Sequence, residues 1–451
     1  MSVFMTSAHR TGSGTPEHPM VIVIGLGIGG MQIADLVSEE KGMTVCGIEG
    51  SADVGGLIVT KEGHNMGPSY HLERHTHLNN LLTKNNAECG CFEELDPNST
   101  IFYSTLRGED AVVHAAEYAA ATQILKDLAG KMEHEALKNV ANEGQIKILR
   151  EAVPWYREMA DYEIKRQDSA LQRKKCFCGD YRKALVTPLH ARLKNKQQRV
   201  RLHFNKEVDT IDKTDQGWIV RSKTDKYECA YLVVAAPVAA LQKFKLGEKV
   251  PSAVKQYIAY LNETITPKAS MRVFVKLKNP TLAAKAREAA GEMLKTHGVS
   301  YLHVLTTVAE FQRVSPLWSM IFEPQATDDC YNFLLAYCDS DAAAQLNENI
   351  KFYDDLLRTV LVESFGIPED ETIDAIDADY IDYHSPNAYH VWDPKTDLSK
   401  HIEYRDGIST DHRIFFVGEA YDPTFSAWIE GALNTACATA NVIKKLNTCI
   451  N

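Results

Sequence analysis

The sequence predicts an α/β protein with two lobes, one of them built around a parallel sheet. The chain has 451 residues, more than a single hydrophobic core usually serves, and 45% of them are hydrophobic, which is enough to fill two cores. Apolar strand patterns near both ends of the chain flank long stretches with helical spacing. The glycine-rich segment 21–60 gives the clearest indication of what the first lobe does.

A strand, a tight turn and a helix open this segment. The β-branched run Val21–Ile24 reads as a buried parallel strand, and Gly25, Gly27 and Gly30 then give the spacing G-x-G-x-x-G. The first glycine makes the turn, the second lets backbone approach a pyrophosphate, and the third lets helix and strand pack closely. The helix N-terminus offers free N–H groups to phosphates.

A second strand ends on an acid at the expected distance. The strand 44–48 closes on Glu49, 24 residues after Gly25, where a carboxylate can accept hydrogen bonds from a ribose diol. The unit is therefore predicted to be Rossmann-like and to bind an adenine dinucleotide.

Composition excludes several classes of function. The net charge is −11, and the only basic run is Arg173–Lys175, which argues against nucleic acid or an anionic membrane surface as a partner. No stretch of about 20 apolar residues could span a bilayer. Residues 1–19 resemble a flexible tail without a signal-peptide core. We expect a protein of the reducing cytoplasm.

Two clusters could suggest a metal, and we interpret neither as a metal site. The C-x-C pairs Cys89/Cys91 and Cys176/Cys178 lack the usual C-x-x-C spacing of zinc sites, so free thiols are expected. The histidines lack ligand-like spacing, and a solvated helix start is expected for them. This second cluster consists of His64, His71, His75 and His77.

The next motif resembles the flavin-containing amine oxidases, the group of monoamine, polyamine and L-amino-acid oxidases. Gly55, Gly56 and Thr60 match the G-G-R-x-x-T that follows the acid-ended strand in that family, but Leu57 replaces its arginine. The resemblance implies FAD as the cofactor and a two-lobe fold of the amine-oxidase and glutathione-reductase type. It covers roughly residues 20–85, 185–280 and 385–445.

Further blocks extend the resemblance. It implies that Met66, Gly67, Pro68 and Ser69 line the isoalloxazine ring and that Tyr70 faces the substrate.

The strand-rich block 199–236 matches the family next, although a generic β-meander is the alternative. By resemblance, Val208 covers the adenine, and Ala235 and Ala236 end the strand that returns to the nucleotide lobe.

The closing block is the second strong signal. A strand over 414–417 leads to Gly418 and Glu419, and Glu419 suits hydrogen bonds to a ribityl chain. A helix of small residues from about Ile429 directs its positive end toward whatever precedes it, and Ala432 allows close packing. If the flavin N1–C2=O edge lies there, the helix stabilises the anionic reduced ring.

The residues that we expect to bind FAD are Gly25, Gly27, Ile28, Gly29, Gly30, Glu49, Gly55, Gly56, Leu57, Met66, Gly67, Pro68, Ser69, Val208, Ala235, Ala236, Gly418, Glu419, Trp428, Ile429 and Ala432.

The resemblance also implies a substrate slot. Tyr389 and Trp428 match two aromatic walls that would admit a neutral amine. Ala388 stands where monoamine oxidases carry the cysteine that attaches flavin, so non-covalent FAD is predicted. Arg272 occupies the place of a family lysine and can only donate hydrogen bonds, with an exposed strand arginine as the alternative. Arg74, like Arg107 and Arg272, could receive a substrate carboxylate.

The predicted domains are discontinuous. The FAD domain takes 20–87, 186–245 and 386–451, and the substrate domain takes 88–185 and 246–385. In the substrate domain we expect few strands before 185, and the elements expected there are helices over 110–128, 133–150 and 351–365 and strands over 271–277 and 331–337.

The implied activity is hydride transfer from the carbon beside an amine nitrogen to flavin N5. This gives an imine, which water hydrolyses to a carbonyl product, and a reduced flavin, which oxygen reoxidises with release of hydrogen peroxide. An L-amino-acid oxidase of the bacterial tryptophan type, a flavin desaturase or isomerase, and a non-catalytic FAD-binding protein stay open. Expected partners are a small amine or amino acid and molecular oxygen, and a homodimer stays open.

Overall fold

The computed structural model describes residues 19–93, 100–104, 112–114, 120, 174–297, 301–306, 317–321, 331–348, 352–372, 375–393 and 396–448. The chain divides into two compact units: unit 1 is Met1–Glu88, Cys178–Pro267 and Tyr389–Asn451, and unit 2 is Cys89–Phe177 and Lys268–Ala388. Of the predicted domain boundaries, the one at residue 245 differs most from the unit boundaries, because helix α9 (Ser252–Thr264) packs into a core of unit 1 and that unit extends to Pro267.

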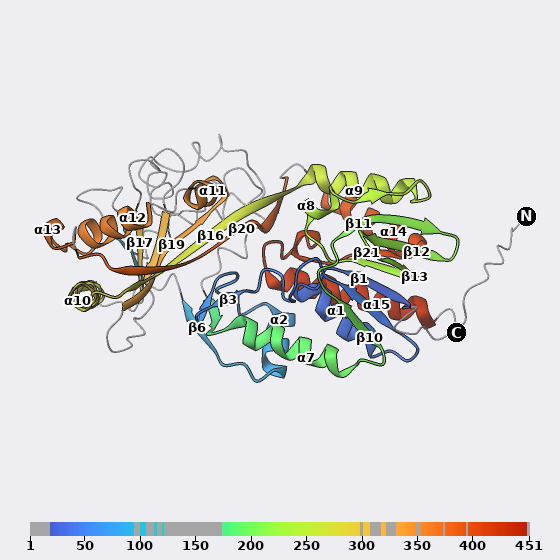
Figure 1. Cartoon of the computed structure of the whole chain (residues 1–451), viewed down its shortest axis with the longest axis horizontal. Coiled ribbons are helices and arrows are strands. Elements are labelled where there is room, and N and C mark those ends of the chain that lie inside the picture. The colour runs from blue at the N-terminus through green and yellow to red at the C-terminus, as the bar shows by residue number, and fades with distance from the viewer. Residues whose placement is uncertain are drawn as a thin grey trace, which may run out of the picture. The chain divides into compact units, whose positions relative to one another are not determined.

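A five-stranded parallel sheet organises unit 1, in the order β10-β2-β1-β14-β21 (Figure 1). Strand β1 is central, and its side chains alternate between two cores. Val21 and Val23 belong to the core formed with helices α1, α7 and α15, whereas Ile22 and Ile24 belong to the core formed with α9 and the β11–β13 sheet. Burial on both faces explains why the strand is apolar throughout.

The elements of the parallel sheet and its helices are β1 (Val21–Ile24), α1 (Ile28–Ser38), β2 (Val45–Ile48), α2 (Thr76–Lys84), the π-helix η3 (Arg182–Val186), α7 (Thr187–Asn195), β10 (Val200–His203), β14 (Tyr231–Val234), α8 (Val238–Leu241), α9, α14 (Leu398–His412), β21 (Ile414–Phe416), the 3₁₀-helix η7 (Glu419–Tyr421) and α15 (Ile429–Thr448). The smaller strands of unit 1 are β3 (Thr60–Lys61), β4 (His64–Asn65), β5 (His71–Leu72), β11 (Val208–Thr214), β12 (Gly217–Ser222), β13 (Lys226–Cys229) and β15 (Lys245–Leu246).

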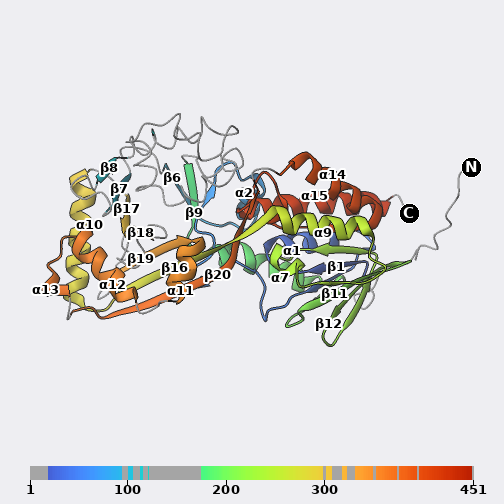
Figure 2. The same ribbon diagram turned by 90° about the horizontal axis from the view of Figure 1, so that it is seen from above.

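A seven-stranded sheet organises unit 2, in the order β20-β16-β19-β18-β17-β7-β8. Alternate residues of β16 (Ile265–Leu277), namely Met271, Val273, Val275 and Leu277, join one apolar core with helices α10 to α12. Figure 2 shows these helices beside the sheet. A strand with one face on a helix layer thus forms the base of this unit.

The other elements of unit 2 are β6 (Cys89–Glu93), β7 (Thr100–Ser104), β8 (Val112–His114), β9 (Lys174–Cys178), α10 (Pro280–His297), β17 (Tyr301–Thr306), β18 (Leu317–Ile321), β19 (Tyr331–Asp339), α11 (Ser340–Glu348), α12 (Tyr353–Thr359), the π-helix η6 (Val360–Ser364), α13 (Glu369–Thr372) and β20 (Ala378–Trp392).

Several sequence-based expectations for this unit need correction. The expected scarcity of strands between 88 and 185 is wrong, because β6 to β9 lie there, and β8 interrupts the helix expected over 110–128. β7 pairs with the nearby β8 and also with the distant β17, and the second pairing could not be predicted from local periodicity. The helix expected over 133–150 and Arg107 lie outside the described residues. The strands expected over 271–277 and 331–337 and the helix near 351–365 are confirmed.

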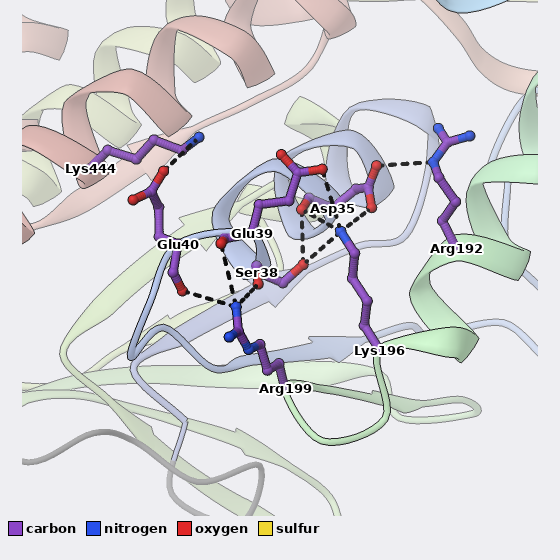
Figure 3. A network of polar contacts seen from close by, with 8 residues as sticks. All are labelled: Asp35, Ser38, Glu39, Glu40, Arg192, Lys196, Arg199 and Lys444. Atoms are coloured by element: carbon purple, nitrogen blue, oxygen red, sulfur yellow. Dashed lines mark hydrogen bonds and ion pairs between the residues drawn. The ribbon is translucent and has the colours of Figure 1, made fainter. Parts of the chain in front are cut away.

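A polar network centred on the buried Asp35 ties α1 to α7 and α15 (Figure 3). The Asp35 carboxylate is 2% exposed and contacts Lys196 Nζ at 2.6 Å and Arg192 Nε at 3.1 Å. Arg199 Nη1 donates to the Ser38 carbonyl at 3.1 Å, at the end of α1 where helix carbonyls lack partners. The network also contains Glu39, and Glu40 with its partner Lys444.

Candidate functional site

The first turn of unit 1 is built for close backbone approach. Gly25 has φ +92°, and a Cβ there would lie 2.6 Å from the Ala235 carbonyl oxygen. A Cβ at Gly30 would lie 2.0 Å from the Gly25 oxygen, so only glycine fits the turn. Helix α1 then begins at Ile28 with Gly27 as its N-cap and no side-chain cap. Its first N–H groups therefore remain suited to an anion.

A second glycine turn lies against the first. The Gly55 N–H donates to the Leu26 carbonyl at 2.9 Å, and a Cβ at Gly56 would lie 3.2 Å from the Gly27 Cα. A Cβ at Gly67 would in turn lie 1.8 Å from the Leu57 oxygen. Three glycine-containing segments thus meet backbone to backbone. This cradle fits the diphosphate of a dinucleotide, which needs N–H groups and no side chains.

Glu49 follows β2, as expected, and its carboxylate contacts the first turn. Its Oε2 accepts from the Leu26 N–H at 2.7 Å, and its Oε1 accepts from the Ser51 N–H at 2.9 Å. A carboxylate has about four acceptor positions, so capacity remains for a ribose diol.

The last helix of the chain packs on the first. A Cβ at Gly29 would lie 3.1 Å from the Ala432 carbonyl and 3.2 Å from a Val417 methyl. The Gly418 N–H donates to Thr435 Oγ1 at 3.0 Å, which fixes the segment after β21 to α15. The glycine turn and the start of α15 are therefore neighbours.

Glu419 makes a contact that the sequence did not predict. Its Oε1 lies 2.5 Å from His390 Nδ1, and its Oε2 accepts from the Ala427 N–H at 2.7 Å. His390 is 2% exposed, and its Nε2 has no hydrogen-bond partner among the described residues. A carboxylate thus orients a buried imidazole directly after Tyr389 on β20.

An aromatic group lies in front of α15. The Tyr70 and Trp428 rings meet edge to face with centroids 5.5 Å apart, and both side chains are half-buried. The His75 ring lies 4.9 Å from the Trp428 ring and 5.6 Å from the Phe425 ring. The Arg74 guanidinium lies 5.8 Å above the Phe425 ring.

His75 is held neutral in this group. It is fully buried, and its Nδ1 lies 3.2 Å from the Leu72 N–H, from which it accepts, so the proton resides on Nε2. Burial lowers the pKa of His75 to about 3, and the charges of His71 and Arg74 act in the same direction. The expectation of a solvated histidine cluster is therefore wrong for His71 and His75, which are 2% and 0% exposed.

Other expected site residues occupy definite places. Val208 begins β11 and is 7% exposed, and the Ala236 carbonyl accepts from the Tyr421 hydroxyl at 2.6 Å. Arg272 lies in unit 2, where it is 7% exposed and stacks over the Tyr337 ring at 4.8 Å. The alternative of an exposed strand arginine is therefore wrong.

The expectation of free thiols also needs correction. Cys89, Cys176 and Cys178 are disulfide-bonded, and strands β6 and β9, which carry them, lie side by side in one sheet. Disulfides persist mainly in oxidising compartments, so they conflict with the reducing setting on which the cytoplasmic prediction rests. Within the described ranges, no cluster of three or more histidine, cysteine or acidic side chains could hold a metal ion. No helix of that part of the chain is long and apolar enough to cross a membrane.

The sequence analysis did not identify the residues that support the site through long-range contacts. Each of these residues contacts a partner more than 25 positions away in the sequence, through a hydrogen bond, an ion pair or a ring contact. They are Asp53, His75, Arg182, His390 and Glu430. No periodic pattern or short motif identifies such partners. One feature of the sequence bears on Arg182: Leu57 stands where the related family has an arginine.

The parallel sheet, the glycine cradle, the acid after β2 and the closing helix together define a dinucleotide-binding α/β protein. A family model described as "Flavin containing amine oxidoreductase" matches residues 154–444. No curated protein matches significantly.

Solved structures of amine oxidases share the fold. A single mutant of putrescine oxidase, made to redesign its cofactor binding, has 14% identity and a TM-score of 0.63 over 95% of this chain and 99% of its own. Wild-type putrescine oxidase bound to putrescine has 13% identity and a TM-score of 0.62 over the same shares. Cyclohexylamine oxidase from Brevibacterium oxydans IH-35A has 14% identity and a TM-score of 0.64 over 95% of this chain and 100% of its own.

The chain belongs to the flavin-containing amine oxidoreductase family, because the family model covers well over half of it. Membership confirms the predicted family, the flavin cofactor and the class of oxidoreductase that acts on CH–NH2 groups. The predicted two-lobe α/β fold is confirmed as well.

Proposed function

We propose that this protein is an oxidase of small amines that holds FAD without a covalent bond. FAD, when bound, would accept a hydride from the carbon beside the amine nitrogen and pass both electrons on to oxygen, which is reduced to hydrogen peroxide. The oxidised substrate is an imine, which water hydrolyses to a carbonyl compound.

The contact between Gly29 and Ala432 carries this proposal. It brings the N-terminus of α1 and the start of α15 together, so two positive helix ends lie near one another. The N-terminus of α1 suits the diphosphate, and the start of α15 suits the edge of the flavin ring that gains negative charge on reduction. Ala388 offers no sulfur for a covalent link, which supports a dissociable cofactor.

The rings of Tyr70 and Trp428 support an amine substrate, with Tyr389 proposed as the opposing wall. Aromatic faces attract the nitrogen end of an amine, while desolvation between them disfavours the ammonium form. The neutral amine has the free electron pair that hydride loss from the neighbouring carbon requires. His75 stays neutral behind Trp428 and adds no repelling positive charge.

The test is a spectroscopic one on the purified protein. We expect a yellow protein whose flavin appears in the supernatant after acid precipitation. Anaerobic addition of the right amine should bleach the visible absorbance, and air should restore it with one peroxide per amine in a peroxidase-coupled assay. A colourless protein that does not take up FAD would refute the proposal, and bleaching without peroxide would favour a desaturase or dehydrogenase.

An amino acid oxidase is the second candidate, and the position of Arg74 favours it. Its exposed guanidinium lies over Phe425, three residues before Trp428, where it could receive a substrate carboxylate. Tryptophan and tryptamine form a matched pair of probes, because they differ only in that carboxylate. Faster bleaching by tryptophan, lost in Arg74→Gln, would establish this candidate, and the reverse order would exclude it for that pair.

The remaining expectations stay predictions. They are a homodimer, to be tested on the purified protein, and a cytoplasmic location, to be tested in the cell; the disulfides described above argue against that location.

A further inference from the structure

Arg182, which is distant in sequence, donates hydrogen bonds to the second glycine turn, residues 53–58. Arg182 begins the π-helix η3, and its Nη1 donates to the Val54 carbonyl at 3.1 Å and to the Ile58 carbonyl at 3.3 Å. Its Nη2 forms an ion pair with Asp53. A single guanidinium therefore holds the turn at both of its ends.

Two glycines with positive φ form this turn. Gly55 and Gly56 have φ values of +106° and +57°, and glycines with such freedom lose much entropy when a turn is ordered. The Gly55 N–H donates to the Leu26 carbonyl at 2.9 Å, and the Ile58 N–H donates to the Gly55 carbonyl at 3.1 Å. The Arg182 side chain lies directly behind Gly55, since a Cβ at Gly55 would be 3.1 Å from Nη1.

We infer that Arg182 is a positioning residue for FAD, a role that rests on the cofactor site proposed above. It holds the Gly55–Gly56 backbone against Gly27, which sets the width of the cradle for the diphosphate. Leu57 cannot supply a cation within this turn, so the stabilising group comes from η3 instead.

The geometry of the guanidinium matters more than its charge. Asp53 balances the charge, and because its side chain is 67% exposed the ion pair itself contributes little. The two carbonyl contacts need donors in a planar fork, which lysine lacks. Arg182→Lys should therefore behave like Arg182→Gln.

Arg192 provides the matched control. It lies on α7, directly after η3, and its side chain bonds to Asp35 and Asn85, neither of which belongs to the turn. Arg192→Gln should destabilise the fold while leaving the cradle intact.

The experiment measures FAD affinity of the apoproteins by quenching of flavin fluorescence, and hydrogen exchange of the backbone over residues 53–58. We expect Arg182→Gln and Arg182→Lys to weaken FAD binding about tenfold or more, as for the loss of one or two charge-assisted hydrogen bonds. Exchange in the turn should be faster in both apoproteins. Arg192→Gln should keep the parental affinity at a temperature where it is folded.

Parental affinity and parental exchange in the Arg182 variants would overturn the inference, and so would an equal loss in Arg192→Gln. If the parental protein itself does not bind FAD, the proposed function fails. The exchange comparison would then still decide whether Arg182 orders the turn.

Discussion

Glu430 Oε2 lies 2.8 Å from the backbone nitrogen of Leu78, and Oε1 of the same carboxylate lies 2.9 Å from that of His77. An acid in the first turn of α15 thus caps the N-terminus of α2, with its side chain 1% exposed. The aromatic group of Trp428 and His75 is placed by these same two helix starts.

Replacing this acid should loosen the connection. In Glu430→Gln one carbonyl oxygen must serve two N–H groups, so we expect a loss of about 1–3 kcal/mol in the free energy of unfolding. Urea denaturation of the holoprotein measures it. The exposed Glu403→Gln on α14 is the control and should change stability by less than about 0.5 kcal/mol. Equal stability of the two variants would contradict the capping role.

The buried Asp35 should contribute more to the free energy of unfolding than the half-exposed Glu39 of the same network. Asp35→Asn leaves Lys196 and Arg192 without their counter-charge, and we expect a cost of about 2–4 kcal/mol, below the full penalty because both cations stay one-quarter exposed. Glu39→Gln, at a half-exposed site 3.7 Å from Lys196, should cost about 0.5 kcal/mol or less. Chemical denaturation at neutral pH would detect the difference.

His75 should make the folded state sensitive to acid. Its pKa is about 3 in the folded chain and near 6.5 in the unfolded chain, so between these values the unfolded state binds the extra proton. The stabilisation is complete above pH 6.5 and decreases as the pH falls toward 3. Between about pH 7.5 and 5 the parental protein should lose about 2 kcal/mol relative to His75→Leu. Parallel stability curves for the two proteins would contradict a buried neutral imidazole.

Alanine should be harmful at Gly30, where the turn leaves no room for a Cβ, and harmless at Gly407, where space is open. Gly30→Ala places a methyl group 2.0 Å from the Gly25 oxygen and should abolish FAD retention or folding. Gly407→Ala on α14 meets nothing within 4 Å and should stabilise its helix by about 0.5–1 kcal/mol. Flavin content after gel filtration and the melting temperature report both effects. A yellow, normally stable Gly30→Ala protein would disprove the close contact.

The disulfides can be tested by counting thiols. Unfolding in denaturant without reductant should leave Cys89, Cys176 and Cys178 unreactive toward a thiol reagent, and prior reduction should expose them. Peptide mapping identifies the cysteines. Full labelling of all three without reductant would restore the free-thiol interpretation.

The parts of the fold that local sequence dictates were predictable. The turn at Gly25, the acid at Glu49 and the helix from Ile429 each follow from a short motif whose residues have one physical task. The groups that support them were not predictable. Arg182 contacts a turn that lies more than 120 residues earlier, and Glu430 accepts from a backbone N–H 353 positions before it. Such pairs depend on the packing of whole elements, which one sequence does not encode in any local period.

The packing of Gly29 on Ala432 also bears on how the protein is made. The first turn leaves the ribosome about 400 residues before the helix that completes it. Until α15 has been synthesised, the nascent sheet therefore lacks one of its covering helices, and we expect stable FAD binding only after that helix has emerged.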